Sequence, residues 1–389
     1  MDLRLDFEAA AAVRLAAAEE VSGQLVRPRW TLSLGAAGSY FARGLIFGDH
    51  LALERAIRMY EENVLPLVPR EQWPAEWAST QVGRGLAMSI LGWLRSDQEL
   101  LFRAIPILAS GLQASPREAD VEQWARARLG LATALLLVGE NTNDASYVGR
   151  ATAELRLVVS ALADERYPLL RASAQVLLGA SISMSGDQAS GAQFEEAIGA
   201  LQAAAGTYAR YGLMEQWAAA QIGLGAALLV AGASERSILR LEEARRALQA
   251  AVPYTPRTRN LHSWAILETN IAYADVQIGQ LRRDVPLLEQ AIERFSQALG
   301  IINEADQPVE WARAQINMAQ AHITIAQVSR DRSRLDVALR RVQAAIPVVQ
   351  RIRHEGLSSH LTNTILFMAR VDEELSPPAT RRESRPRGR

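Results

Sequence analysis

The chain has 389 residues, a net charge of −1 and 49 % hydrophobic residues, so it can build a core but has no basic field that would attract nucleic acid or an anionic membrane. It contains no Cys, and all 42 basic residues are Arg. The first absence excludes disulfides, cysteine metal sites and thiol nucleophiles, and the second excludes the Walker P-loop, Schiff-base chemistry and the Ser-x-x-Lys pair.

The N-terminal residues, MDLRLDFEAAAAVRL, carry three acidic side chains and no continuous apolar core, so they do not resemble a secretory signal. Further along, residues 216–234 form an uncharged stretch whose length approaches that of a membrane span. That stretch contains two Gln and three Gly, and its Trp217 falls in the repeat register described next. We therefore expect a cytoplasmic protein that does not contact membranes.

Tryptophan recurs along the chain at a nearly constant interval. Six of the eight Trp residues are separated by steps of 47, 47, 93, 47 and 47 residues. Arg171 takes the Trp position at the middle of the double step, and Ser358 takes it one step after the last Trp. The six residues are Trp30, Trp77, Trp124, Trp217, Trp264 and Trp311. An interval of this length indicates a repeated supersecondary unit.

An alanine recurs in parallel with the tryptophan, at steps of 46 to 48 residues. It occupies Ala56, Ala104, Ala151, Ala197, Ala244, Ala291 and Ala338, and one step earlier lies Ala9. The segments around both markers show helical spacing; Trp217, Leu224 and Leu228, for example, lie on one face of a 3.6-residue helix. Each repeat therefore predicts two helices, a Trp-bearing helix A and an Ala-bearing helix B.

Clusters of Gly, Asn, Asp, Ser and Pro separate the predicted helices, for example at 138–144, 184–191 and 304–310. Strand-type alternation is not evident. The pattern predicts about seven A–B helix pairs with a half-unit at each end, forming one all-α domain over residues 1–375. Residues 376–389, SPPATRRESRPRGR, contain five Arg and no large apolar side chain, which predicts a disordered Arg-rich tail.

Two short patterns accompany the period. Helix A ends in Leu-Gly-x-Ala-Leu in WAAAQIGLGAALL, and helix B opens with Leu-Glu-x-Ala in LEEARRAL. These residues resemble the tetratricopeptide repeat, in which a Leu-Gly pair on helix A packs against a small residue on helix B. The match is to the pairs 178–179 and 224–225 and to the helix-B alanines, over about residues 5–374. The resemblance implies a right-handed α-solenoid of stacked antiparallel helix pairs.

The repeat departs from that family in its period, which is 47 residues rather than 34, and in its Trp, which lies one turn upstream of the usual aromatic position. A HEAT-like or armadillo-like solenoid, whose periods reach 47, is the alternative. Glycines within helix A cost about 1 kcal/mol each against Ala, and close approach of two helix backbones would offset that cost. These glycines are Gly83, Gly85, Gly130, Gly223 and Gly225.

Two asparagines, Asn270 and Asn317, each lie six residues after their Trp. In the family that the repeat resembles, an Asn at this place of helix A faces the concave groove and hydrogen-bonds the backbone of a bound peptide. The matching residues of earlier units are Gly83, Gly130 and Gly223, which offer no side chain. The candidate groove residues are therefore Asn270, Tyr273, Gln277, Arg313, Asn317 and Gln320. Solvated polar residues on an open face are the other interpretation of the same pattern.

Patterns that indicate catalysis or metal binding are missing from the sequence. No two of the five His residues are at i, i+4, and neither HExxH nor GxSxG occurs. Acidic pairs such as Glu195–Glu196 open helix B, where the helix N-terminus favours negative charge. We assign no catalytic, cofactor-binding or metal-binding residue and expect no cofactor.

The first functional hypothesis is a non-enzymatic scaffold or adaptor that binds a peptide or protein segment in its concave groove. One alternative is a sensor or regulatory subunit of a bacterial signalling or defence system, with its effector on another chain. The other is an enzyme with a groove site, which the missing Lys, Cys and His motifs disfavour. The expected partner is another protein or peptide rather than a membrane or nucleic acid, and self-association through the terminal helices stays open.

Overall fold

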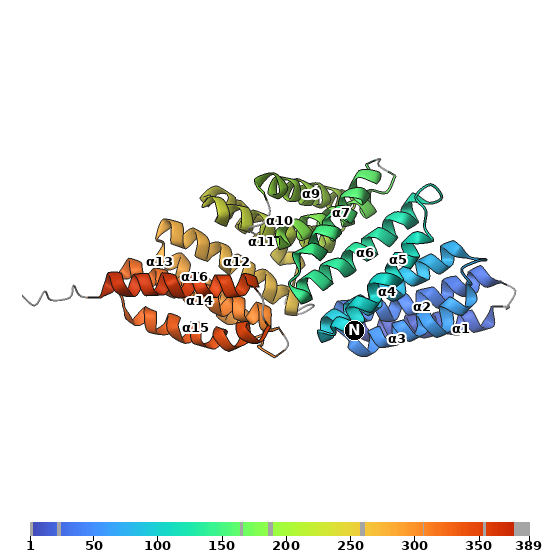
Figure 1. The fold of residues 1–389 in the computed structure, drawn as a ribbon, viewed down its shortest axis with the longest axis horizontal. Coiled ribbons are helices and arrows are strands. Elements are labelled where there is room, and N and C mark those ends of the chain that lie inside the picture. Colours follow the sequence, from blue (N-terminus) through green and yellow to red (C-terminus); the bar gives the residue numbers. More distant parts are fainter. Residues whose placement is uncertain are drawn as a thin grey trace, which may run out of the picture. The chain divides into compact units, whose positions relative to one another are not determined.

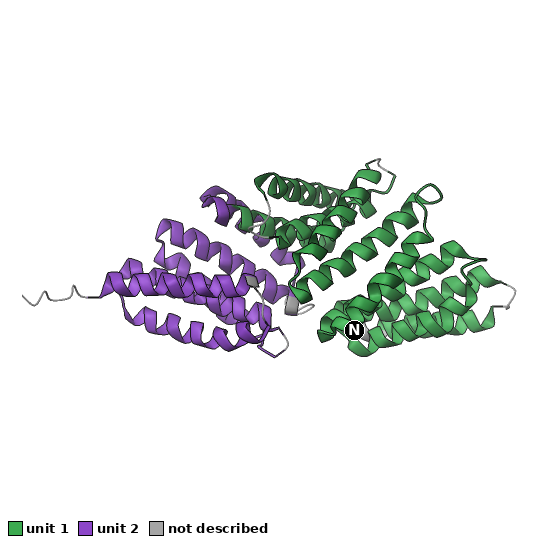
Figure 2. Cartoon of the chain, viewed as in Figure 1, with its two compact units in different colours: residues 1–231 green, residues 232–389 purple. Residues whose placement is uncertain are grey.

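In the computed structural model the chain is helical, and no strand occurs among the residues that the structure describes (Figure 1). These residues are 3–21, 25–163, 166–185, 190–256, 261–305, 307–352 and 355–376. Their contacts divide the chain into two compact units, residues 1–231 and residues 232–389 (Figure 2). The predicted all-α fold is confirmed. The predicted disordered tail lies outside the described residues from residue 377 onward.

The helices alternate along the chain in the order that the two sequence markers predict. Unit 1 contains α1 (Leu3–Glu20), α2 (Val26–Phe47), α3 (His50–Met59), α4 (Pro74–Arg95), α5 (Gln98–Gln113), α6 (Val121–Thr142), α7 (Ala145–Ala161), α8 (Pro168–Met184) and α9 (Gly191–Arg210). A π-helical turn (Tyr60–Val64) and a 3-10 turn (Leu65–Leu67) follow α3. Helix α10 (Met214–Glu235) begins in unit 1 and ends in unit 2. Unit 2 continues with α11 (Ile238–Ala251), a 3-10 turn (Val252–Tyr254), α12 (Leu261–Arg282), α13 (Val285–Leu299), α14 (Pro308–Ser329), α15 (Ser333–Ile352) and α16 (Glu355–Leu375).

Within each unit the helices pack as consecutive pairs. In unit 1, α4 packs on α5, α6 on α7 and α8 on α9, while α4 also contacts α6 and α6 contacts α8. In unit 2, α12 packs on α13 and α14 on α15, while α14 also contacts α12 and α16. Successive Trp-bearing helices thus lie beside one another, and each is covered by its own partner helix. This is the stacked helix-pair arrangement of an α-solenoid.

Turns of two or three residues that begin in one conformation join the helices of most pairs. The first turn residue is left-handed, and the second is usually an Asp whose carboxylate caps the next helix; Asp284, for example, accepts from the Leu287 backbone N–H at 3.1 Å. The left-handed residues, with φ of 54° to 63°, are Gly48, Ser96, Asn143, Arg236, Arg283 and Arg330. The caps that accept from the next helix include Asp49, Asp97, Asp144, Ser237 and Asp284.

Close approach of the paired helices depends on small residues, as predicted from the glycines within helix A. A Cβ at Gly92 would lie 3.0 Å from both Cγ and the backbone N of Leu101, and one at Gly179 would lie 2.4 Å from a Leu201 methyl group. The recurring alanine of helix B is fully buried at Ala56, Ala104, Ala151, Ala197, Ala244, Ala291 and Ala338. The glycines therefore bring each helix A onto a large side chain of helix B, which interlocks with it.

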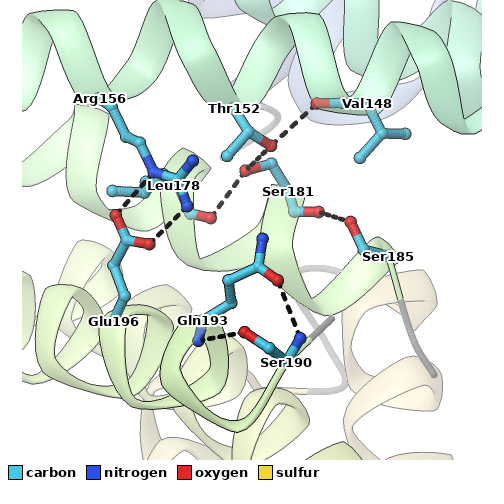
Figure 3. Close-up of polar contacts among 9 residues, drawn as sticks. All are labelled: Val148, Thr152, Arg156, Leu178, Ser181, Ser185, Ser190, Gln193 and Glu196. Carbon is cyan, nitrogen blue, oxygen red and sulfur yellow. Dashed lines mark hydrogen bonds and ion pairs between the residues drawn. The ribbon is translucent and has the colours of Figure 1, made fainter. Parts of the chain in front are cut away.

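Polar contacts connect successive helices of unit 1 as well, as Figure 3 shows for α7, α8 and α9. The guanidinium of Arg156 on α7 donates two hydrogen bonds to the Glu196 carboxylate on α9, at 2.8 and 2.6 Å. On α7 as well, Thr152 Oγ1 lies 3.0 Å from Ser181 Oγ of α8, and both residues are buried. Each hydroxyl also bonds a backbone carbonyl of its own helix, Val148 or Leu178, so the pair adds a buried polar contact between α7 and α8.

Helix α14 is the most enclosed Trp-bearing helix of unit 2. Ala312, Ile316 and Ile323 belong to a core shared with α15 and α16, whereas Met318 and Ile325 belong to a core shared with α12 and α13. Trp311 packs against the first core and also against a third cluster formed by Ala265, Ala298 and Ile302. The recurring Trp therefore acts here as a wedge between successive helix pairs.

Helix α10 contains the uncharged stretch noted in the sequence. It is the one helix among the described residues that is long and apolar enough to cross a membrane, and half of its most hydrophobic window is buried inside the structure. In unit 1, Ala220 and Trp217 of this helix pack with Ala204 and Tyr208 of α9. Its apolar side chains are thus used, at least in part, for packing against neighbouring helices.

Candidate functional site

A polar pocket of about 410 Å³ lies in unit 2. It is formed by the Trp-bearing helices α12 and α14, by α16 and by the end of α10, with no residue from α11, α13 or α15. On α14 its residues are spaced i, i+4, i+7, so one face of that helix is turned toward the pocket. The lining residues are Ala233, Arg236, Gln277, Gln280, Leu281, Gln320, Thr324, Gln327, Phe367 and Arg370.

Four glutamines dominate the lining, and they differ in what they bind. The Gln320 amide donates to Thr364 Oγ1 at 3.0 Å and lies 3.0 Å from His360 Nε2, and the Gln327 amide donates to the Glu374 carboxylate at 2.9 Å. The side chains of Gln277 and Gln280 have no hydrogen-bond partner among the described residues. Two primary amides, each with two donors and an acceptor, are therefore available to a ligand.

Two arginines give the pocket a positive charge. Arg236 and Arg370 are both exposed, and neither forms an ion pair within the described part of the chain. The Arg370 guanidinium stacks at 5.9 Å from the ring centroid of Phe367, another lining residue. Glu374 is the acid bonded to the lining, through Gln327. The pocket thus combines free amide groups with two cations that lack a counter-charge.

The structure brings only part of the predicted groove together. Of the predicted groove residues, Gln277 and Gln320 line the pocket. Arg313 is exposed and lies outside the lining. Loss of water around the His360 ring and the nearby charge of Arg313 lower the pKa of that histidine to about 4. Asn270 is half-buried and is not part of the lining, and Tyr273 packs against the core shared by α12, α13 and α14.

The prediction for Asn317 needs correction. Its side chain is only 3 % exposed, and its Oδ1 has no hydrogen-bond partner among the described residues. It therefore does not lie on an open groove surface. The prediction took the orientation of helix A from the resembling family, whereas in α14 the face that lines the pocket begins three residues later, at Gln320.

Sequence reasoning missed Gln280, Gln327, Arg236 and Arg370. A signal for the first two was present, because they are 47 residues apart and therefore occupy the same place in successive repeats. The two arginines carried no such signal, since Arg236 follows the end of α10 and Arg370 lies in the last, least regular copy. No cluster of three or more potential metal ligands occurs among the described residues.

No family model matches the chain, and no curated protein matches it either. Among solved structures, the chain is similar to one described as a circular tandem repeat protein with novel repeat topology and enhanced subunit contact surfaces. That similarity has a TM-score of 0.31 and 17 % identity, and it covers 96 % of this chain and 90 % of the other. The helical repeat is therefore assigned from this chain's own helices and contacts.

Proposed function

We propose that the chain is a non-enzymatic, tetratricopeptide-like scaffold whose unit 2 binds an extended acidic segment of another protein in the polar pocket. The observation that carries the proposal is the pairing of two free amides, Gln277 and Gln280, with two uncompensated guanidinium groups, Arg236 and Arg370. An extended peptide presents unpaired N–H and C=O groups, which primary amides can bind on both sides. Carboxylate side chains of the same peptide would pair with the arginines.

The small size of the pocket and its polar lining favour a short segment over a folded surface. Affinity in such sites comes from a few anchors, and here these are the two arginines. Because both arginines are exposed, their ion pairs with a ligand would be screened by salt. We therefore expect binding that weakens as the ionic strength rises.

A selection from a displayed library of random 12-residue peptides on the immobilised full-length protein tests this proposal. We expect enriched peptides to be rich in Asp and Glu. Titration of one enriched peptide, followed by fluorescence anisotropy, should then show about tenfold weaker binding for Arg236→Ala with Arg370→Ala, because charged hydrogen bonds are lost. Gln277→Ala with Gln280→Ala should weaken binding as well.

The matched control is Gln290→Ala with Gln343→Ala, since both glutamines are exposed on helices α13 and α15, which do not line the pocket. This variant should bind like the wild type. The two glutamine variants should keep the thermal midpoint of the wild type, because their side chains have no hydrogen-bond partner among the described residues. The arginine variant should lose only the exposed contact of Arg370 with the Phe367 ring, so its midpoint should change little. Enriched peptides without acidic residues, or equal binding by the pocket variants, would refute the proposal.

A further inference from the structure

One helical position of the Trp-bearing helices is buried and apolar in most repeats. It is occupied by Met88, Leu135, Ile182 and Leu228, each at most 4 % exposed. In unit 2 the same position holds Asp275 on α12 and His322 on α14, which are 3 % and 5 % exposed. Since buried polar side chains require partners, the surroundings of these two residues decide what the position is used for.

On α12 the buried acid is matched inside the chain. Asp275 pairs with Arg245 of α11 at 3.3 Å and faces Arg294 of α13 at 3.7 Å. About two helical turns earlier on the same face, Glu268 pairs with Arg294 at 2.6 Å. Two carboxylates and two guanidinium groups therefore compensate one another where α11, α12 and α13 meet.

On α14 the corresponding place keeps one of the two arginines, since Ile292 takes the place of Arg245, and it has lost both acids. Arg341 of α15 is 47 residues after Arg294, whereas Glu268 and Asp275 are replaced by Gln315 and His322. Gln315 Oε1 accepts from Arg341 at 3.2 Å, and Arg341 forms no ion pair in the described ranges. The Nδ1 atom of His322 is buried without a partner.

The charges around His322 are almost all positive. Arg334, Arg340 and Arg341 lie on α15, and together with burial they lower the pKa of His322 to about 4. Burial and the charge of Arg340 also lower the pKa of Arg341. Glu289 of α13 forms an ion pair with Arg334. Asp331 also lies 3.8 Å from Arg334.

We propose that a carboxylate group binds where α13, α14 and α15 meet, a place that we name the notch, and that the guanidinium of Arg341 and the ring of His322 hold it. The ligand would supply Arg341 with the counter-charge that Glu268 supplies to Arg294 one repeat earlier. Gln315 and His322 lie on the face of α14 opposite to Gln320 and Gln327, because they are rotated by about half a turn. The notch is therefore a second site, and it does not depend on the proposed function of the pocket.

Acetate is the probe for this site, and the thermal midpoint of the full-length protein at pH 7 and constant ionic strength is the readout. Acetate in place of chloride should raise the midpoint of the wild type in a saturable way. The double variant Gln315→Glu with His322→Asp restores the internal acids, so it should melt higher without acetate and respond to acetate with about tenfold lower apparent affinity. The pKa of His322, followed by NMR in the wild type, should rise when acetate binds.

The reciprocal variant Glu268→Gln with Asp275→His is the control. It removes the acids of the preceding repeat, so it should melt lower than the wild type and gain a stronger response to acetate. Identical effects of acetate and chloride on the wild type, together with an unchanged pKa of His322, would overturn the proposal. A saturable response to inorganic phosphate but not to acetate would also overturn it, since the site would then be a phosphate site.

Discussion

At the scale of single residues, the buried His322 and the half-buried His360 of unit 2 make stability depend on pH. Burial, with the charges of Arg334, Arg340 and Arg341 around His322 and of Arg313 beside His360, lowers the pKa of each from 6.5 to about 4 in the folded chain. The unfolded chain therefore binds protons first as the pH falls below 6.5. Stability is complete above that pH and is lost on acidification down to about pH 4.

The variant His322→Leu tests this linkage, because leucine fits a position that is apolar in other repeats. Each histidine should contribute a slope of about 1.4 kcal/mol per pH unit to the free energy of unfolding between pH 6.5 and 4. The difference between wild type and variant should therefore grow by that amount per unit as the pH falls. Urea unfolding in buffers without carboxylate would measure it, and parallel pH profiles of the two proteins would contradict it.

Glycines of the helix interiors fall into two groups that substitution by alanine should separate. A Cβ at Gly92 would lie 3.0 Å from Leu101 and 3.1 Å from the Asp97 carbonyl, whereas nothing lies within 4 Å of one at Gly199. We expect Gly92→Ala to destabilise by about 1–3 kcal/mol through overpacking. Gly199→Ala should stabilise by about 0.5–1 kcal/mol, because alanine is the better helix former. Denaturant unfolding of both variants would check this, and equal effects would show that close packing does not explain the glycines.

At the scale of elements, the turn between paired helices places arginine in a conformation that favours glycine. Arg283 has φ of 56°, is exposed and forms no ion pair in the described ranges. Left-handed backbone costs a non-glycine residue about 1 kcal/mol or more. Asp284, the next residue of the same turn, would still cap α13. Replacing Arg283 alone should therefore not alter the neighbouring helices.

We therefore expect Arg283→Gly to raise the free energy of unfolding by about 0.5–1 kcal/mol. The matched control is Arg246→Gly, because Arg246 is an exposed arginine in the middle of α11. There glycine should lower stability by about 1 kcal/mol. Thermal unfolding of both variants would measure the difference, and a loss of stability at position 283 would show that the turn does not carry this strain.

Local elements were predictable because their signals are local. The Trp and Ala markers predicted each pair of helices. Each marker residue is constrained by its own helix and by the one helix that packs directly against it. The left-handed turns were not predicted, because Arg283 and Arg330 are not turn-forming residues and adopt that conformation only under the constraint of the flanking helices. The burial of Asn317 was not predicted either, because helical spacing alone does not show which residues of α14 the neighbouring helices enclose.

At the scale of the whole molecule, periodicity did not predict how the contacts divide. Trp217 and Trp264 keep the 47-residue step on either side of residue 231, and α10 runs through that point. One α-solenoid domain over residues 1–375 stays a prediction, and the contacts of the chain group into two compact units. A repeat pattern reflects the packing of each helix pair on the next one. It holds no information on how many pairs group into one compact unit.

The pocket belongs to the same scale, because it requires residues from four helices that only the folded unit 2 brings together. Gln277 and Gln320 were predicted from their helices one at a time. Arg236 and Arg370 were not, although they give the site its charge. The central claim is that these amides and guanidinium groups bind an extended acidic segment.

The most direct test is NMR of the full-length protein labelled with ¹⁵N in its glutamine side chains, titrated with one of the selected acidic peptides. The account predicts that the side-chain amide signals of Gln277 and Gln280 shift in proportion to bound peptide, while those of Gln290 and Gln343 stay in place. Binding of the peptide without movement of the Gln277 and Gln280 signals would contradict it.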